Sequence, residues 1–201
     1  MKKAIIGAGG FGKEVYHQIL DNYPFEKITF FADDQYAQDN ILPLSKFDPE
    51  KYEVVVAIGD PSTREKVVNN LPKNTKFFKF IHNSVLILSD DIFIGEGSII
   101  CPGSILTCNI KIGKHSHLNL HTTIGHDCII GDYLTTAPGA NISGKCTIGN
   151  RVYIGTNSSI RERTNICDDV TIGLNSGVVK HITDSGVYGG TPIKKLKDWF
   201  K

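Results

Sequence analysis

Residues 142–159 read ISGKCT-IGNRVY-IGTNSS, three six-residue units that each begin with isoleucine. The same period continues in both directions, so that sixteen consecutive hexads without an insertion fill the chain from Leu88 to Thr183. Fifteen of their first positions are Ile, Leu or Val, with Thr136 as the exception, and every fifth position is small or apolar. A period of six fits neither an α-helix nor an alternating strand. It is typical of short strands and turns wound into a parallel β-helix.

The first and fifth positions of such hexads are expected to point into a narrow interior that admits only small or aliphatic side chains. Glycine occupies seven second positions, including Gly125, Gly131 and Gly149, and we expect it to provide the unusual backbone angles of tight turns. The pattern resembles the left-handed parallel β-helix of the hexapeptide-repeat acyltransferases, in which three hexads make one triangular coil. That resemblance implies that residues 18 apart lie one above the other, so that Cys128 stacks on Cys146 in the core.

The overall composition excludes several classes of protein. The 201 residues carry 22 Lys and Arg against 21 Asp and Glu, whereas a dedicated nucleic-acid binder needs an excess of cations. No apolar run approaches the ~20 residues that span a bilayer, and the first residues lack the apolar core of a signal peptide, so we expect a cytoplasmic protein. The five cysteines include no C-x-x-C pair, which favours free thiols over disulfides or structural zinc, and we expect no metal.

The first 82 residues have the pattern of a small α/β unit, and residues 83–201 form the second predicted domain. Gly7-x-Gly9-x-x-Gly12 follows an apolar run, and Asp33 comes 21 residues after Gly12. That spacing is the dinucleotide fingerprint, in which bare backbone N–H groups and a helix N-terminus face phosphate. The unit is only half of a complete doubly wound fold, so it favours one nucleotide, as in a sugar donor; NAD(P) or a turn without a ligand are the alternatives. Strands are expected over 3–7, 27–32, 53–58 and 76–81, and helices over 13–22 and 61–70.

Among the seven histidines, His126 is distinguished by the aspartate that follows it in Gly125-His126-Asp127-Cys128. It takes the third position of its hexad, which places it at a corner of the coil and not in the core. An imidazole beside a carboxylate suits the removal of a proton from an attacking amine or alcohol at neutral pH. His126 is therefore the candidate general base, and Asp127 the group that supports its basicity.

The whole chain resembles the sialic acid O-acetyltransferase and nucleotide-4-amino-sugar N-acetyltransferase family (NeuD/PglD-like), in which a Rossmann-like unit precedes a left-handed β-helix. The matching segments are 6–12 (IGAGGFG), 33–34 (DD), 57–60 (AIGD), 125–132 (GHDCIIGD) and 189–194 (GGTPIK). The resemblance implies that His126 is the catalytic base and Asp127 its acidic partner. It also implies two binding sites: a nucleotide-sugar site of Gly9, Gly10, Phe11, Asp33, Asp34, Gly59 and Asn119, and an acetyl-CoA site of Thr135, Thr156, Leu174, Gly190 and Pro192. Phe11 stands where members of the family often carry histidine.

The activity implied by this resemblance is transfer of an acetyl group from acetyl-CoA to the amino group of a nucleotide-linked 4-amino-4,6-dideoxysugar, by direct attack. O-acetylation of sialic acid or another sugar hydroxyl needs the same base and is one alternative. A non-catalytic scaffold that binds sugar nucleotides is the other. The resemblance further implies a homotrimer with active sites between subunits, which agrees with the fact that one prism offers His126 only one side of a cleft.

Overall fold

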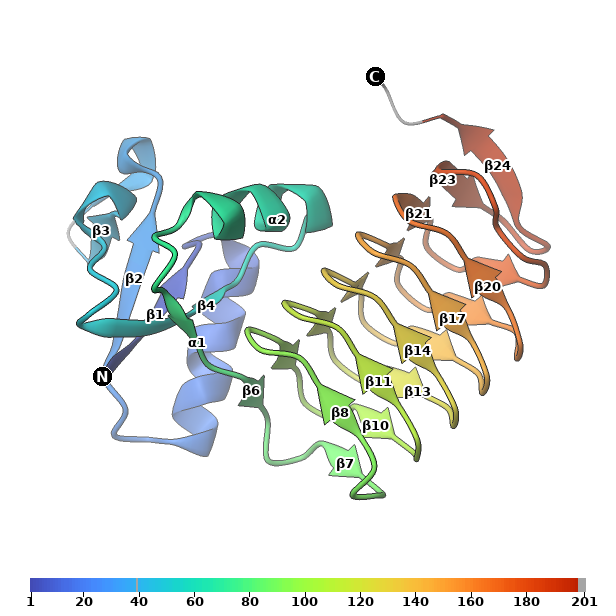
Figure 1. The fold of residues 1–201 in the computed structure, drawn as a ribbon, viewed down its shortest axis with the longest axis horizontal. Helices are drawn as coiled ribbons and strands as arrows, with labels where there is room; N and C mark the ends of the chain where they lie inside the picture. Colours follow the sequence, from blue (N-terminus) through green and yellow to red (C-terminus); the bar gives the residue numbers. More distant parts are fainter. Residues whose placement is uncertain (39, 199–201) are drawn as a thin grey trace.

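The computed structural model describes residues 1–38 and 40–198, which form a small α/β domain followed by a long prism (Figure 1). The sheet of the α/β domain is parallel and has the order β3-β2-β1-β4-β5, so the strand order reverses between β1 and β4. The elements of this domain are β1 (Lys2–Ile6), α1 (Gly10–Asn22), β2 (Ile28–Ala32), the 3-10 helix η1 (Asp34–Tyr36), β3 (Ile41–Pro43), the 3-10 helix η2 (Leu44–Lys46), β4 (Tyr52–Val56), α2 (Pro61–Asn70) and β5 (Lys76–Phe77).

The central strands β1 and β4 are buried on both faces, which explains their nearly unbroken apolar runs. Ile5 packs against Val15 and Ile19 of α1. Its neighbour Ile6 points to the opposite face and joins the cluster that includes Val67 of α2. The two helices therefore cover opposite faces of the sheet.

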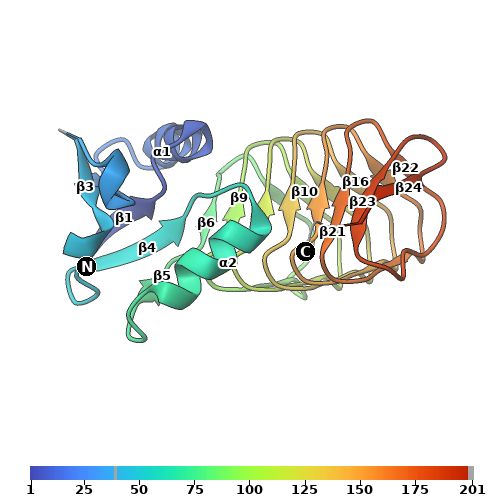
Figure 2. The same ribbon diagram turned by 90° about the horizontal axis from the view of Figure 1, so that it is seen from above.

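Three further sheets form the prism, and we number them in the order in which the chain first enters them (Figure 2). Each regular coil gives one short strand to each sheet, and paired residues lie 18 apart, as with His117 beside Thr135. The left-handed parallel β-helix expected from the hexads is confirmed. Sheet 1 contains β6 (Phe80–Ile81), β9 (Ile99–Ile100), β12 (His117–Leu118), β15 (Thr135–Thr136), β18 (Tyr153–Ile154), β21 (Val170–Ile172), β23 (Gly186–Gly189) and β24 (Lys194–Lys197). Sheet 2 contains β7 (Leu86–Ile87), β10 (Ile105–Leu106), β13 (Thr123–Ile124), β16 (Asn141–Ile142), β19 (Ser159–Ile160) and β22 (Gly177–Val178). Sheet 3 contains β8 (Phe93–Ile94), β11 (Lys111–Ile112), β14 (Ile129–Ile130), β17 (Thr147–Ile148) and β20 (Asn165–Ile166).

The first positions of the hexads form the core of the prism. Every one of them over 94–178 is buried, including Thr136, whose hydroxyl is hydrogen-bonded inside the core. The expectation for the first hexad is wrong, because Leu88 is 64% exposed. Ile87, and not Leu88, pairs with Leu106 of the next coil, so the chain has one extra residue before the regular period begins.

Two elements differ from the sequence expectations by more than a shift of one or two residues at their ends. The single strand expected over 76–81 is two strands in different sheets, since β5 joins the α/β sheet whereas β6 pairs with β9 of the prism. The first helix begins at Gly10, earlier than expected, because Gly9 acts as its N-cap. The glycine-rich loop is therefore shorter, and its last residues already belong to the first helical turn.

At six of the seven second positions, glycine is required by space and not by backbone angles, which corrects the expectation from the sequence; Gly173 is the exception. Positive φ angles occur at fourth positions instead, as at Asp127 and Gly139. A Cβ atom on Gly155 would lie 2.7 Å from the carbonyl carbon of Gly173, one coil away. Glycine therefore lets neighbouring coils approach to the strand spacing of about 4.8 Å.

The variant Gly155→Ala should lower the free energy of unfolding by about 1–3 kcal/mol, because the added methyl group must push two coils apart. Gly173→Ala is the matched control, since it has the same hexad position but its Cβ would meet nothing closer than 3.4 Å. Thermal melting should place Gly155→Ala about 2–10 °C below the control. Equal melting temperatures for the two variants would contradict the spatial explanation.

Arg64 of α2 fixes the α/β domain to sheet 1 of the prism. Its side chain is fully buried, and its guanidinium donates to the carbonyl of Ile58 on its own domain and to those of His115 and Leu134 in the prism. It also donates to the Thr135 hydroxyl at 2.9 Å. Burial lowers the pKa of Arg64 to about 9, but the group stays protonated at neutral pH and its hydrogen bonds persist.

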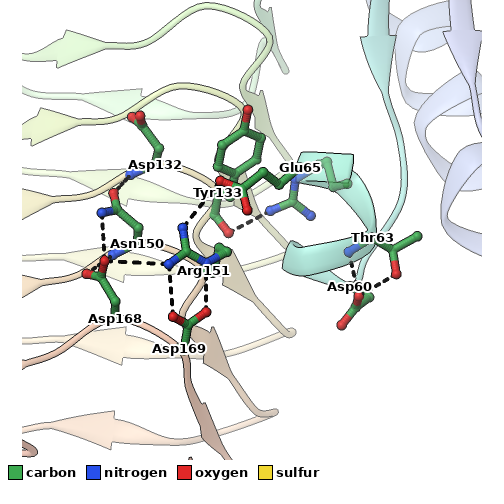
Figure 3. Close-up of polar contacts among 10 residues, drawn as sticks. Asp60, Thr63, Glu65, Asp132, Tyr133, Asn150, Arg151, Asp168 and Asp169 are labelled. Carbon is green, nitrogen blue, oxygen red and sulfur yellow. Dashed lines mark hydrogen bonds and ion pairs between the residues drawn. The ribbon is translucent and has the colours of Figure 1, made fainter. Parts of the chain in front are cut away.

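A second link between the domains lies where sheets 3 and 1 meet. Arg151 contacts Glu65 of α2 at 3.3 Å, and its Nε donates to Asp169 at 2.7 Å (Figure 3). Asn150 and Asp168 form a side-chain ladder between coils beside it. These contacts hold the α/β domain against sheet 1 and its border with sheet 3.

Candidate functional site

A cavity of about 700 Å³ opens at the carboxyl ends of β1 and β2. Parallel sheets of this kind bind ligands outside the carboxyl ends of their strands. Gly9 and Asp33, both expected to contact the nucleotide, line the cavity together with apolar side chains such as Ile41 and Leu44. The size and mixed lining suit a nucleoside placed between the glycine-rich loop and η1.

The N-terminus of α1 borders this cavity and is free to receive an anion. Gly9 offers no side-chain cap, and the first helical turn contains no acidic residue. A Cβ atom on either Gly9 or Gly10 would meet nothing within 4 Å. The space beside Gly9 and Gly10 is therefore open next to the positive end of the helix, which is the arrangement that binds phosphate.

Other residues expected at the nucleotide-sugar site have different surroundings. Both carboxylate oxygens of Asp34 accept hydrogen bonds from Ser45, which lower the pKa of Asp34. Phe11 packs its ring 5.1 Å from that of His117 at the junction with the prism. Gly59 lies at the same junction, where its carbonyl accepts from Arg64. Asp34, Phe11 and Gly59 thus shape the surroundings of the cavity and do not line it.

His126 lies on the edge between sheets 2 and 3, and its side chain is 55% exposed. Its Nδ1 is 2.8 Å from Oδ2 of Asp127. A carboxylate only accepts hydrogen bonds, so Nδ1 carries the proton and Nε2 has a free lone pair for an incoming proton. Hydrogen bonds from His126 and Asn109 hold the pKa of Asp127 below its usual value, which keeps the carboxylate ionised.

Two residues that the sequence reasoning missed hold this pair in place. Asn109, one coil earlier, donates from Nδ2 to Oδ1 of Asp127 at 2.7 Å. Gly144, one coil later, lies beneath the ring, and a Cβ there would be 2.6 Å from Nε2 of His126. The 18-residue spacing from Asp127 and His126 is the sequence signal that would have found both.

A groove of about 250 Å³ lies beside His126 on the outer face of sheet 2. It is lined by residues from neighbouring coils, including Thr123, Gly125, Asn141 and Ser143. The groove is open, so a single prism supplies only one of its walls. Its lining residue Gly125 directly precedes His126, and this position suits the reacting end of a substrate.

The predicted site residues do not meet within one chain. Asn119, Thr156 and Leu174 lie along the edge between sheets 1 and 2, whereas His126 lies on the edge between sheets 2 and 3. The α/β domain sits against sheet 1, the one sheet that does not border the edge of His126. The remaining acetyl-CoA candidates are Thr135, which is 5% exposed and donates to the carbonyl of Gly59, and Gly190 and Pro192, which connect β23 to β24.

Within residues 1–38 and 40–198, no group of three or more His, Cys, Asp or Glu side chains is arranged to hold a metal ion. In the same ranges no helix combines the length and the apolarity that crossing a bilayer requires. The five cysteines are free, and Cys128 and Cys146 lie in the core of the prism. Contact with Cys146, together with burial, raises the pKa of Cys128, so this thiol is not poised as a nucleophile.

Comparison with known proteins places this architecture in a family. Residues 2–71 match the family model of the PglD N-terminal domain. The GDP-perosamine N-acetyltransferase of Escherichia coli O157:H7 is 29% identical over 153 residues, which cover 70% of this chain and 69% of that protein. The structure of WeeI from Acinetobacter baumannii AYE is 32% identical and covers 98% of this chain and 100% of that one, with a TM-score of 0.90.

A further similar structure is the acetyltransferase domain of PglB from Neisseria gonorrhoeae FA1090 in complex with acetyl coenzyme A. It is 28% identical, covers 97% of this chain and 98% of that one, and has a TM-score of 0.87. The resemblance noted in the sequence is confirmed over both domains. The chain, with its half-Rossmann domain and its left-handed β-helix, belongs to the NeuD/PglD-like family of acetyltransferases.

Proposed function

We propose that this protein transfers the acetyl group of acetyl-CoA to the amino group of a nucleotide-linked 4-amino-4,6-dideoxysugar. The observation that carries the proposal is the combination of an uncapped helix N-terminus beside a nucleotide-sized cavity with an exposed histidine–aspartate pair on the prism. The relatives support it, because one is named for N-acetylation of a GDP-linked amino sugar and another holds acetyl coenzyme A.

The geometry of His126 supports a direct transfer. The amine nitrogen attacks the thioester carbonyl while Nε2 of His126 accepts one amine proton, and Asp127 stabilises the resulting imidazolium through Nδ1. The new C–N bond forms as the C–S bond breaks, and the proton passes from His126 to the departing thiolate of coenzyme A. The core thiols Cys128 and Cys146 take no part in this sequence.

The exposed Cys108 tests whether the transfer is direct, because it occupies the hexad position of His126 one coil earlier. Under direct attack, Cys108→Ala should keep wild-type turnover. Mass spectrometry of wild-type protein after incubation with acetyl-CoA alone should show no stable acetyl adduct. An adduct on Cys108 together with an inactive alanine variant would contradict the mechanism.

We further propose a closed homotrimer in which His126 of one chain faces the nucleotide domain of another. The reason is the separation within one chain, where the α/β domain lies against sheet 1 and His126 lies on the opposite edge. Apolar side chains are exposed on either side of that edge, namely Leu86 and Ile129, and a neighbouring prism would bury them. A ring of three repeats one interface and closes on itself.

Light scattering should give a mass near 66 kDa, three times the 22.1 kDa of the chain. Equal amounts of His126→Ala and Gly9→Trp subunits should together regain about a quarter of wild-type activity after exchange. In a random mixture, about one shared site in four combines an intact His126 from one chain with an intact Gly9 from another. With the nucleotide sugar held well below the KM of Gly9→Trp, neither variant alone should reach this level. A fully active monomer, or the absence of any restoration after demonstrated exchange, would place the whole site in one chain.

The activity itself is tested with purified protein, acetyl-CoA and a panel of UDP-, GDP- and dTDP-linked amino sugars. Mass spectrometry should find one acetyl group on the amino sugar, and a thiol reagent should detect coenzyme A release. Hydroxyl-only analogues of the same nucleotide sugars serve as the matched control. Acetylation of those analogues at an equal rate would favour O-acetylation, and tight nucleotide-sugar binding without thioester cleavage would favour a scaffold.

A further inference from the structure

The prism edge that carries His126 becomes rich in positively charged side chains toward the C-terminal coils. In the coils that follow His126, this edge presents Lys145, then Arg161 and Arg163, and then Lys180, all of them exposed. Backbone hydrogen bonds fix this order, because Lys145 N donates to the carbonyl of His126 at 2.7 Å and Arg163 N donates to that of Gly144 at 3.0 Å. We call these four cations the basic edge.

The basic edge is only partly neutralised within the described chain, because Asp127 interacts with the charge of Lys145 and Glu162 lies between the two arginines. None of its four side chains forms an ion pair within 4.0 Å among residues 1–38 and 40–198, and Glu162 is the only carboxylate that its coils place between them on the edge. Some other cations of the prism are paired, as Lys114 is with Glu96 at 2.8 Å and Arg151 with Asp169 at 2.7 Å. Exposed cations that are left without partners along one line are suited to a polyanion.

The spacing of the edge matches one component of the reaction. Coils stack about 4.8 Å apart, so the coil of Arg161 and Arg163 lies about 10 Å from His126 and that of Lys180 about 14 Å away. The extended pantetheine arm of coenzyme A is about as long as four extended residues, or about 14 Å. A thioester placed at Nε2 of His126 therefore has its phosphates within reach of these coils.

We propose that the basic edge binds the phosphate groups of coenzyme A, with Arg161, Arg163 and Lys180 as the phosphate ligands. The coenzyme then runs along the edge from His126, whose ring packs over Gly144 of the next coil, toward the C-terminal coils. Guanidinium groups bind phosphate through paired N–H donors, which gives direction as well as charge. This inference rests on the proposed acetyl transfer, and it assigns phosphate recognition to residues outside the motifs that carry the family resemblance.

The test compares two thioesters that differ only in their phosphates, acetyl-CoA and acetyl-pantetheine. The double variant Arg161→Gln/Arg163→Gln should raise the KM for acetyl-CoA about 10- to 100-fold, since a charge-assisted contact contributes roughly one factor of ten or more. Its kcat at saturation and its kcat/KM with acetyl-pantetheine should stay within twofold of wild type. Lys180→Gln should show the same pattern with a smaller effect.

The matched control is Lys66→Gln/Lys73→Gln, which removes the same charge from exposed positions on the α/β domain. It should leave the KM for acetyl-CoA unchanged, and thermal melting should show that all variants are folded. An unchanged KM in the edge variants, or an equal loss with both thioesters, would overturn the proposal.

Failure of the proposed function is distinguishable from failure of this inference. If wild-type protein acetylates no amino sugar, calorimetry with coenzyme A alone still tests whether the basic edge binds the phosphates of coenzyme A. Binding that weakens about 10-fold or more in the double variant supports the basic edge. Equal affinity of wild type and double variant, or no binding by wild type, overturns it.

Discussion

His126→Ala should reduce turnover about 10²- to 10⁴-fold, the usual contribution of a positioned general base. The expected loss falls on kcat, because the exposed ring contributes little to binding or to packing. The corner should keep its shape, since its backbone hydrogen bonds do not involve the side chain and Asp127 keeps the contact with Asn109. Steady-state kinetics at saturating concentrations of both substrates measure the effect.

The matched control for this variant is His17→Ala, which removes an exposed histidine from α1, far from the prism edge. Its turnover should equal that of the wild type, and both variants should melt within a few degrees of it. His126→Gln is a further check, because it keeps a polar group of similar reach but cannot take up a proton. Wild-type turnover in His126→Ala would exclude this residue as the base.

Gly9→Trp should raise the KM for the nucleotide sugar about 10- to 100-fold and change the KM for acetyl-CoA less than twofold. Gly9 has ordinary backbone angles of φ −71° and ψ −172°, and its Cβ would enter open space. The chain should therefore fold normally while the indole occupies the space in front of the first turn of α1. Calorimetry with each ligand separates the two affinities.

Gly12→Ala gives the contrasting result, although the residue belongs to the same motif. A Cβ on Gly12 would collide with the backbone carbonyl of Gly7, so this variant should lose stability and weaken both ligands together. Equal weakening of both ligands by Gly9→Trp would mean that it too disturbs the fold. Weakening of acetyl-CoA alone would reverse the assignment of the two domains.

Much of the architecture follows from local patterns in the sequence. The hexads predict the β-helix because every hexad repeats the same local pattern, in which an aliphatic side chain points inward and a turn forms the corner. The G-x-G-x-x-G loop likewise places a helix N-terminus beside a strand end, which is a local consequence of backbone geometry. His126 and Asp127 are neighbours in the chain, so their contact was also predictable from the sequence.

The period alone misassigned features that depend on packing between coils. Second-position glycines such as Gly155 are required because a neighbouring coil leaves no room for a Cβ atom, and not because of a positive φ angle. Leu88 satisfies the hexad pattern but is displaced by one residue from the register that its neighbour sets. Thr135, which the family resemblance assigns to the acetyl-CoA site, has its hydroxyl buried against the α/β domain, a contact that the period does not reveal.

The sequence by itself predicted the fold of each half, the candidate base and the candidate phosphate site, because all of these arise from residues close together in the chain or related by a fixed period. Only the tertiary structure decided which side of the prism the α/β domain occupies. One of the contacts behind that choice is Arg64, whose hydrogen bonds join segments about fifty to seventy residues apart and which no local pattern distinguishes from a solvated helical arginine. It places the nucleotide domain and His126 on different sides of one chain, because a prism with three sheets has an edge that no domain docked on a single sheet can cover.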